Sequence, residues 1–239
     1  MTSQQGNHTM NATNGKNLQV QYLGRQPYRP VWEYQRRLQQ LRIAGEIPDT
    51  LLLLEHDPVY TIGKNGTDAN VIASETFLRT RGIEVVEVDR GGDVTYHGPG
   101  QLVGYPIFDL HQHQKSISFY MRHLEQVFID ALQSWGIDAG RKEKLTGVWV
   151  HDEKIVALGV RISRWVTMHG FAFNLNPELE HYLGIIPCGI TQYGVTSLAK
   201  LLGKQVDMAE ARSRVIDSFQ KVFGFSQIKI ENEDSNEFK

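Results

Sequence analysis

The sequence predicts an α/β (α+β) protein with a mixed β-sheet flanked by helices. Three segments repeat apolar residues with the period of an amphipathic helix, and several shorter runs have strand character. The strands do not alternate regularly with helices, because they crowd between residues 147 and 176 with only short connections. This order favours a mixed sheet over a parallel, doubly wound one.

Apolar periodicity and end signals locate the helices. Pro30 suits a first helical turn, and Asp207 with Glu210 three residues later resembles a capping box. Gly224 then closes that last helix. We expect helices at Pro30–Ala44, Ser118–Trp135, Ser197–Leu202 and from Asp207 to Gly224.

Short runs rich in β-branched and aromatic residues mark the strands. The segment His151-Asp152-Glu153 is typical of a tight turn and predicts a hairpin between two of them. We expect strands at Thr50–His56, Ile83–Asp89, Leu102–Leu110, Gly147–Val150, Lys154–Ile162, Thr167–Asn176 and Gln227–Ile230.

The polar composition of both ends predicts tails around one domain. Residues 1–16 hold almost nothing to bury, and residues 231–239 are acidic, which leaves residues 17–230 as a single folded domain. With 25 basic and 27 acidic residues, there is no basic excess of the kind that binds nucleic acid. No apolar run is long enough for a membrane span, and no secretory signal is visible, so we expect a cytoplasmic protein. The one cysteine excludes an intrachain disulfide.

The segment Arg90–Gln101 is the densest unusual stretch of the chain. It contains four of the 22 glycines and offers Arg, Thr, Tyr and His donors that could hold a carbonyl, carboxylate or phosphate. It is not a dinucleotide fingerprint, because Val103 stands where the third glycine belongs, and no Gly-Lys-Ser/Thr of a P-loop follows. We therefore expect a ligand-binding loop rather than a plain turn.

Cys188 is a candidate nucleophile because Pro187 and Gly189 place it in a tight, irregular segment. Only about 3% of an unperturbed cysteine is thiolate at pH 7, so a cationic neighbour must lower its pKa. Lys154 and His169 both lie on nearby predicted strands, and sequence spacing leaves the choice between them open.

Two further groups of charged or titratable residues have simpler interpretations. His111 and His113 alternate as metal ligands on a strand would, but no acidic or cysteine ligand supports them, so we expect solvent-exposed loop histidines and no metal. A second group could meet acidic partners or form a solvated helix face: Arg36, Arg37 and Arg42.

Several motifs in the same order along the chain resemble the lipoyl(octanoyl) transferase family. The resemblance covers roughly residues 20–225. It is carried by Glu55-His56-x-Pro58-Val59-Tyr60-Thr61, Arg90-Gly91-Gly92-x-x-Thr95-Tyr96-His97-Gly98-Pro99-Gly100-Gln101-Leu102-Val103-x-Tyr105-Pro106, Thr146–Val150, Lys154–Arg161, His169-Gly170-Phe171-Ala172-x-Asn174 and Pro187-Cys188-Gly189-Ile190.

The resemblance implies a fold similar to the catalytic domains of biotin and lipoate protein ligases. It also implies that Cys188 takes the acyl group as a thioester, and that Lys154 lowers the cysteine pKa and shuttles a proton. No ATP, metal or other cofactor is then required. The implied substrate-binding residues are Arg90, Gly91, Gly92, Asp93, Val94, Thr95, Tyr96, His97, Ala157, Leu158, Gly159, Gly170, Phe171 and Ala172.

The implied partners are an octanoyl-acyl carrier protein as donor and, as acceptors, lipoyl domains of 2-oxoacid dehydrogenase complexes and the glycine cleavage H protein. Three alternatives share some of these features: an ATP-dependent lipoate-protein ligase-like enzyme, a relative that binds acyl carriers without catalysis, and a cysteine hydrolase with His169 or His97 as base. The intact pair of Cys188 and Lys154 favours the transferase.

Overall fold

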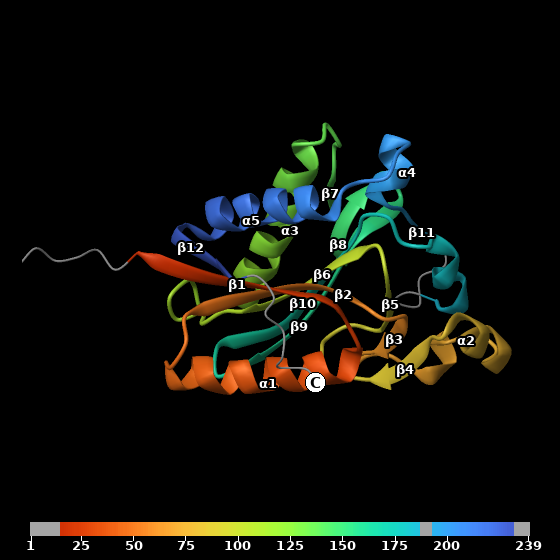
Figure 1. Ribbon diagram of the computed structural model, residues 1–239, viewed down its shortest axis with the longest axis horizontal. Coiled ribbons are helices and arrows are strands. Elements are labelled where there is room, and N and C mark those ends of the chain that lie inside the picture. Colours follow the sequence, from red (N-terminus) through yellow and green to blue (C-terminus); the bar gives the residue numbers. More distant parts are fainter. Residues whose placement is uncertain (1–14, 187–192, 232–239) are drawn as a thin grey trace, which may run out of the picture.

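The computed structural model describes residues 15–186 and 193–231, and in that part of the chain nine strands form one mixed sheet (Figure 1). Its order is β12-β1-β2-β6-β10-β9-β8-β7, and β11 pairs with β9. The pairs β12–β1, β1–β2 and β11–β9 are parallel, and the other neighbours are antiparallel. A smaller sheet has the order β4-β3-β5. The expected mixed sheet is confirmed.

The strands of the large sheet are β1 (Lys16–Gln26), β2 (Asp49–His56), β6 (Gln101–Ile107), β7 (Gly140–Lys142), β8 (Leu145–Val150), β9 (Glu153–Ser163), β10 (Val166–Asn174), β11 (Gly194–Val195) and β12 (Phe225–Glu231). Those of the small sheet are β3 (Val59–Ile62), β4 (Glu84–Glu87) and β5 (Val94–His97). The helices are α1 (Tyr28–Ala44), α2 (Glu75–Arg81), α3 (Ile117–Gln133), α4 (Leu198–Leu202) and α5 (Met208–Phe223), with short 3₁₀ turns η1 (Asp68–Asn70) and η2 (Leu179–Gly184).

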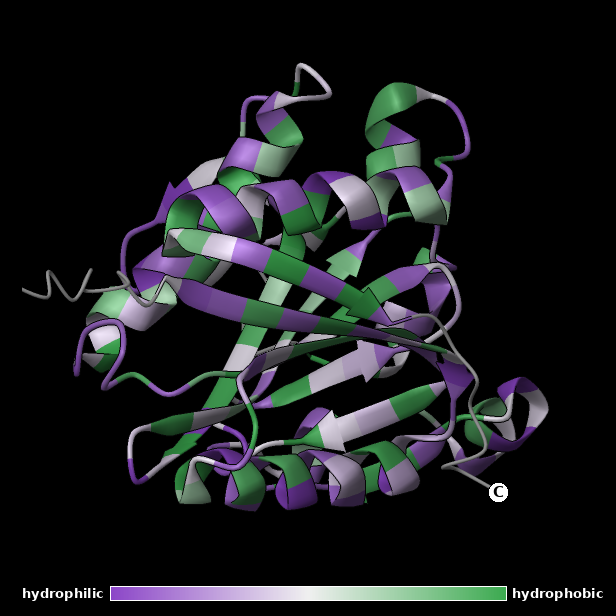
Figure 2. Cartoon of the chain, turned by 60° about the vertical axis from the view of Figure 1, so that its left-hand side comes forward, coloured by the Kyte–Doolittle hydropathy of each residue, from purple (hydrophilic) through white to green (hydrophobic). Residues whose placement is uncertain are grey.

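The helices cover the large sheet from both faces. Helices α3 and α5 lie on one face, where their apolar residues join the largest core cluster, and α1 lies on the other face with a smaller cluster (Figure 1). Bands of apolar and polar residues run along the helices, as expected for elements with one face on a core (Figure 2). No helix in residues 15–186 and 193–231 is long and apolar enough to cross a membrane.

The end signals read from the sequence act as expected. The Asp207 carboxylate accepts a hydrogen bond of 2.8 Å from the backbone N–H of Glu210, and Gly224 ends α5 in the left-handed region at φ 69°. His151 and Asp152 form the two-residue turn between β8 and β9, with His151 at φ 51°. These local predictions are confirmed.

Some elements differ from the sequence analysis. One third of the expected ligand loop is strand β5, in which Val94–His97 pairs with β3. Strands β1 and β3 and helix α2 were not predicted, because β1 carries polar residues on its half-exposed positions and the other two are short. Lys16, which was assigned to the N-terminal tail, is the first residue of β1.

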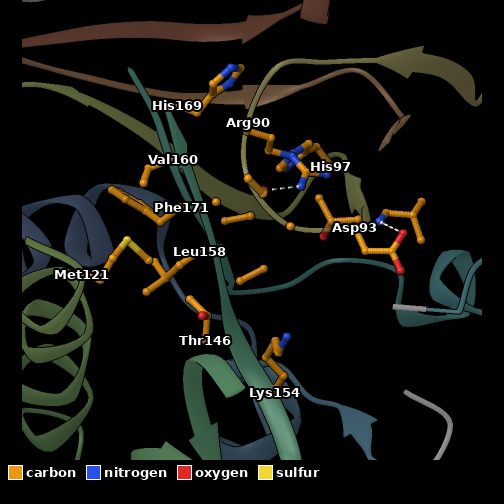
Figure 3. A pocket seen from close by; sticks show the side chains of 18 of the residues that line it. Arg90, Asp93, His97, Met121, Thr146, Lys154, Leu158, Val160, His169 and Phe171 are labelled. Atoms are coloured by element: carbon orange, nitrogen blue, oxygen red, sulfur yellow. Dashed lines mark hydrogen bonds between the residues drawn. The ribbon is translucent and has the colours of Figure 1, made fainter. Parts of the chain in front are cut away.

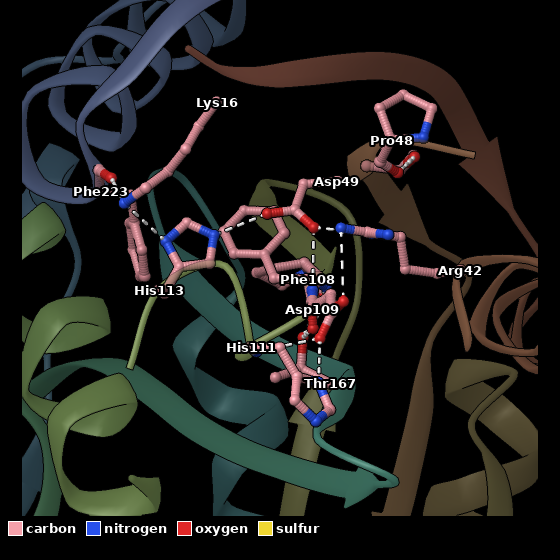
Figure 4. A network of polar contacts seen from close by, with 12 residues as sticks. Lys16, Arg42, Pro48, Asp49, Phe108, Asp109, His111, His113, Thr167 and Phe223 are labelled. Atoms are coloured by element: carbon pink, nitrogen blue, oxygen red, sulfur yellow. Dashed lines mark hydrogen bonds and ion pairs between the residues drawn. The ribbon is translucent and has the colours of Figure 1, made fainter. Parts of the chain in front are cut away.

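The prediction that His113 is solvent-exposed is wrong, and so is the solvated position of Arg42. The His113 side chain is 2% exposed and packs against Phe108 and Phe223. Its Nε2 lies 2.6 Å from Asp49, while Arg42 Nε donates to the same carboxylate at 2.9 Å (Figure 4). A single buried carboxylate therefore binds both side chains in the interior, which the spacing of residues along the chain does not reveal. His111 is exposed, as predicted.

Candidate active site

One cavity of about 540 Å³ collects almost all of the predicted site residues (Figure 3). It lies beside β9 and β10, under the segment after β4, and reaches the start of α3 and the turn between β7 and β8. Its size is within the range of about 300–1,000 Å³ that small-molecule sites occupy. Predicted residues that line it are Arg90, Gly91, Gly92, Asp93, Val94, Thr95, His97, Lys154, Ala157, Leu158, Gly159, Gly170, Phe171 and Ala172. Cys188 is outside the described residues.

Tyr96 does not line the cavity, although the resemblance included it among the binding residues. Its side chain is buried against Tyr60 and Tyr182, and its hydroxyl lies 2.7 Å from His181 Nδ1. Because β5 alternates its faces, Tyr96 points away from the side that Thr95 and His97 present to the cavity. In the structure, Tyr96 packs against η2 and supports it.

The segment Arg90–Asp93 is held in place by Arg90 itself. The buried guanidinium donates to the Thr61 carbonyl at 2.6 Å and to the Thr61 hydroxyl at 2.8 Å. The backbone N–H of Gly91 donates to the Val160 carbonyl at 2.9 Å, so this segment covers part of the outer edge of β9. A Cβ atom on Gly159 would lie only 3.0 Å from the Gly91 carbonyl, which explains the need for glycine at this close approach.

Lys154 lies at the other end of the cavity, where β8 leaves the edge of β9. Its Nζ is 4.8 Å from the centroid of the Trp149 ring. Gly147 packs against the lysine stem: at φ 130°, a Cβ there would lie 2.7 Å from the Val156 carbonyl and 3.3 Å from Lys154 Cε. The backbone N–H of Gly147 points to the buried Glu125 carboxylate at 3.4 Å. Sequence analysis assigned no role to Glu125 or Gly147.

The backbone around Lys154 ties it to the segment after Cys188. Val195 of β11 pairs with Lys154, and the Thr196 N–H donates to the Lys154 carbonyl at 3.0 Å. Cys188 precedes Val195 by seven residues in the sequence. The chain therefore returns to the side of Lys154 shortly after Cys188.

His169 is fixed by Asp89, a residue that the sequence analysis placed only in a strand. The Asp89 carboxylate receives hydrogen bonds from His169 Nε2 at 2.8 Å and Trp32 Nε1 at 3.2 Å, and Arg161 lies 3.0 Å away. Burial alone would raise the pKa of Asp89, but the hydrogen bond from His169 and the charge of Arg161 lower it to about 2.

The same contact determines the state of the imidazole. Burial lowers the pKa of His169 despite the opposing effect of Asp89, so the ring is neutral, with its proton on Nε2. Nδ1 is then a bare acceptor, and it has no partner among the described residues. A neutral ring bound to Asp89 is a poor cationic neighbour for a thiolate, which leaves Lys154 as the better of the two candidates.

Two more histidines are neutral: His97 lines the cavity, and the His56 ring packs against it. The Gln26 carbonyl only accepts hydrogen bonds, so His56 Nδ1–H donates to it at 2.9 Å and His56 Nε2 accepts from the Tyr105 hydroxyl at 2.7 Å. Burial lowers the pKa of His56 to about 4 and the pKa of His97 well below its ordinary value. His97 Nδ1 is buried, and no described residue bonds to it. His56 and Tyr105 belong to motifs of the resemblance, but sequence analysis assigned them no role.

The fold is similar to that of lipoate-protein ligases. A crystal structure of lipoate-protein ligase A bound with ATP superposes with a TM-score of 0.69 at 14% identity and covers 92% of this chain and 90% of its own. A putative lipoate protein ligase from T. acidophilum with bound lipoic acid gives a TM-score of 0.67 at 15% identity, covering 92% and 88%. At these identities the likeness shows the fold.

Sequence comparison then assigns the family. The family model of the Lipoyl protein ligase A/B catalytic domain matches residues 27–220. An octanoyltransferase from Caldicellulosiruptor saccharolyticus is 52% identical over 222 residues, which cover 92% of this chain and 94% of that protein. The chain belongs to the lipoyl protein ligase A/B catalytic domain family, and its relatives make it an acyltransferase of the octanoyltransferase branch.

Proposed function

We propose that the chain transfers an octanoyl (or lipoyl) group from acyl carrier protein to a lysine of lipoyl domains, through a thioester on Cys188. The observation that carries the proposal is the position of Lys154 in the cavity that the predicted acyl-binding segments line. Val195, which follows Cys188 by seven residues, pairs with Lys154 in the sheet. This supports the proposed contact between the side chains of Cys188 and Lys154.

The first step exchanges one thioester for another. Lys154 stabilises the thiolate of Cys188, which attacks the carbonyl of the carrier thioester and forms a new C–S bond. The bond between the acyl carbon and the carrier sulfur breaks, and the carrier leaves as a thiol with the proton that Lys154 held. This exchange costs little free energy.

The second step makes an amide. The neutral amine of the acceptor lysine attacks the Cys188 thioester, the cysteine leaves as thiolate, and Lys154 accepts the proton from the nitrogen. Negative charge on the carbonyl oxygen needs donors in both steps. The hydrogen-bond donor could be a backbone N–H at Gly170 or Cys188, or the side chain of Thr95 or His97. Of these residues, Gly170, Thr95 and His97 line the cavity.

The remaining cavity residues have binding roles in this proposal. The acyl chain lies between the segment Arg90–His97 and the strands at Ala157–Gly159 and Gly170–Ala172. Arg90 acts by holding the segment against β3, because its hydrogen bonds go to Thr61 and Gly91. Acceptors of the proposed class are the lipoyl domains of 2-oxoacid dehydrogenase complexes and the glycine cleavage H protein.

A transfer assay tests the proposal against the other members of this fold. The protein is incubated with octanoyl-acyl carrier protein and an apo lipoyl domain without ATP, and we expect the lipoyl domain to gain the mass of one octanoyl group. Transfer from free octanoate that requires ATP would identify a ligase instead. Release of free octanoate with no acylated domain would identify a hydrolase.

A further inference from the structure

The face of β9 that looks toward the start of α3 is an apolar surface that begins in the cavity and continues beyond it to the β9–β10 turn. Beyond the buried Val156, its side chains are only half-buried, and they join half-buried residues of α3 and of the β9–β10 turn at the margin of the large core. Figure 3 shows Met121, Leu158 and Val160 on the α3 side of β9, opposite Arg90 and His97. The α3–β9 surface consists of Ile117, Met121, Leu158, Val160, Ile162 and Trp165.

This surface is open because the neighbouring elements stop short of it. Strand β8 pairs with β9 only from Glu153 to Val156, and α3 packs on α5 and β8. Ile117, the first residue of α3, is 56% exposed although it also lines the cavity. The α3–β9 surface is thus continuous with the cavity that holds Lys154.

Trp165 is held on this surface at a cost in backbone strain. Ser163 pairs with Val166, so Arg164 and Trp165 form a two-residue hairpin turn, with φ values of 49° and 65°. Such turns normally use Asn and Gly, because a bulky side chain is disfavoured at positive φ. A large aromatic residue kept in this conformation at the margin of an open apolar face indicates a use for it outside the core.

Basic side chains surround the α3–β9 surface. Lys115, Lys144 and Arg164 are all exposed. Lys115 Nζ stands 5.9 Å from the Trp165 ring centroid, and neither Lys115 nor Arg164 has an ion-pair partner among the described residues. Lys144 lies 3.8 Å from Glu143 on the highly exposed β7–β8 turn. An apolar floor with a basic rim complements a protein that presents acidic side chains around an apolar patch.

We infer that the α3–β9 surface docks an acidic carrier protein that delivers the acyl thioester; this rests on the proposed function. The length of the surface favours the donor over the acceptor. It extends along β9 as far as Arg164, ten residues and about 33 Å from Lys154 at about 3.3 Å per residue. A carrier bound there can still reach Lys154, because its acyl group sits on a long, flexible prosthetic arm. An acceptor lysine is far shorter and needs its domain directly above Lys154.

Charge reversal with two kinds of donor tests the inference. The variant K115E/R164E is compared with K204E/K229E, which changes the same charge at exposed lysines beside α4 and in β12. We expect kcat/KM for octanoyl-acyl carrier protein to fall about tenfold or more in the first variant only, with the loss growing smaller at high salt. Octanoyl-N-acetylcysteamine, a small thioester without a carrier, should be used within about twofold of the wild-type rate by both variants.

The other outcomes each overturn the inference. An equal loss with the small thioester would mean that the surface binds the acyl group or that the fold is damaged. A loss that appears only when the lipoyl domain is varied would assign the surface to the acceptor, and no change would leave it without a docking role. If the wild-type protein transfers octanoyl from neither donor, the proposed function itself fails.

Discussion

Two buried polar clusters flank the large sheet, and they differ in how completely their hydrogen bonds are satisfied. In the cluster around Asp49, one carboxylate oxygen accepts from Arg42 and from the backbone N–H of Asp109, and the other accepts from His113 (Figure 4). Lys16 donates to His113 Nδ1 at 3.3 Å, which fixes the proton of that ring on Nε2. None of these side chains has an unpartnered buried atom.

The cluster around the cavity is left incomplete. His97 and His169 each keep a buried Nδ1 without a partner among the described residues. An unsatisfied buried group costs about 1–3 kcal/mol, which a ligand that bonds to it would offset. Under the proposed function, the complete network around Asp49 stabilises the fold, and the incomplete one lies where the substrate would bind.

The largest expected effect is on the rate of octanoyl transfer when Lys154 is replaced. Lys154→Gln removes the cation and proton carrier of the proposed reaction, and we expect octanoyl transfer to fall by about 10³-fold or more with the fold intact. Lys142→Gln, at an exposed ion pair with Asp152, is the matched control and should keep most of the activity. Transfer rates and circular dichroism measure both effects. Near-normal transfer by Lys154→Gln would refute its role.

The Asp49 cluster should respond in the opposite way. Asp49→Ala leaves the buried Arg42 without its main counter-charge, and we expect a loss of about 3–5 kcal/mol in the free energy of unfolding. The transfer rate per folded molecule should stay close to that of the wild type. Asp57→Ala, which breaks the exposed pair with Arg25, should cost at most about 1 kcal/mol. Equal losses in urea denaturation would contradict the distinction.

The neutral histidines near the cavity predict how stability depends on pH. His56 has a folded pKa of about 4, below its ordinary value of 6.5, so unfolding takes up a proton between these values. Its contribution is complete above about pH 6.5 and is lost as the pH falls toward 4, by about 3 kcal/mol in total. His56→Gln should flatten this part of the profile in urea titrations. An unchanged slope would show that other groups produce it.

The smallest expected effect is at His169. His169→Asn keeps a residue that tolerates the observed φ of 58° but withdraws the ring acceptor from the cavity. We expect about a tenfold loss in kcat/KM for transfer. The change in unfolding free energy should be below about 1 kcal/mol, because Asp89 retains Trp32 and Arg161. The exposed His111→Asn is the control. A large loss of stability with normal activity would show that His169 stabilises the fold and takes no part in transfer.

Sequence predicted the local parts of this structure better than the long-range ones. The N-cap at Asp207 and the hairpin turn at His151 were predicted because each signal acts between residues at most four positions apart. The motif residues gathered in one cavity because the resemblance carried their arrangement with it. Tyr96 is the one predicted residue of the segment Arg90–His97 that does not line the cavity, because its ring packs against Tyr60 and Tyr182, and a motif does not show such packing.

The long-range partners were beyond a single sequence. His113 meets Asp49 across 64 positions and His169 meets Asp89 across 80, so nothing in the local pattern signals either pair. Sequence analysis assigned no role to Glu125, yet its buried carboxylate binds Arg141 and accepts from the Gly147 N–H beside Lys154. Only the packing of α3 on β8 reveals that role.

The most direct test of the central claim is intact-protein mass spectrometry after incubation with octanoyl-acyl carrier protein. We predict one octanoyl adduct that hydroxylamine removes, that an apo lipoyl domain discharges, and that Cys188→Ala lacks. Octanoyl transfer that proceeds without any adduct, or an adduct that persists in Cys188→Ala, would contradict the thioester mechanism.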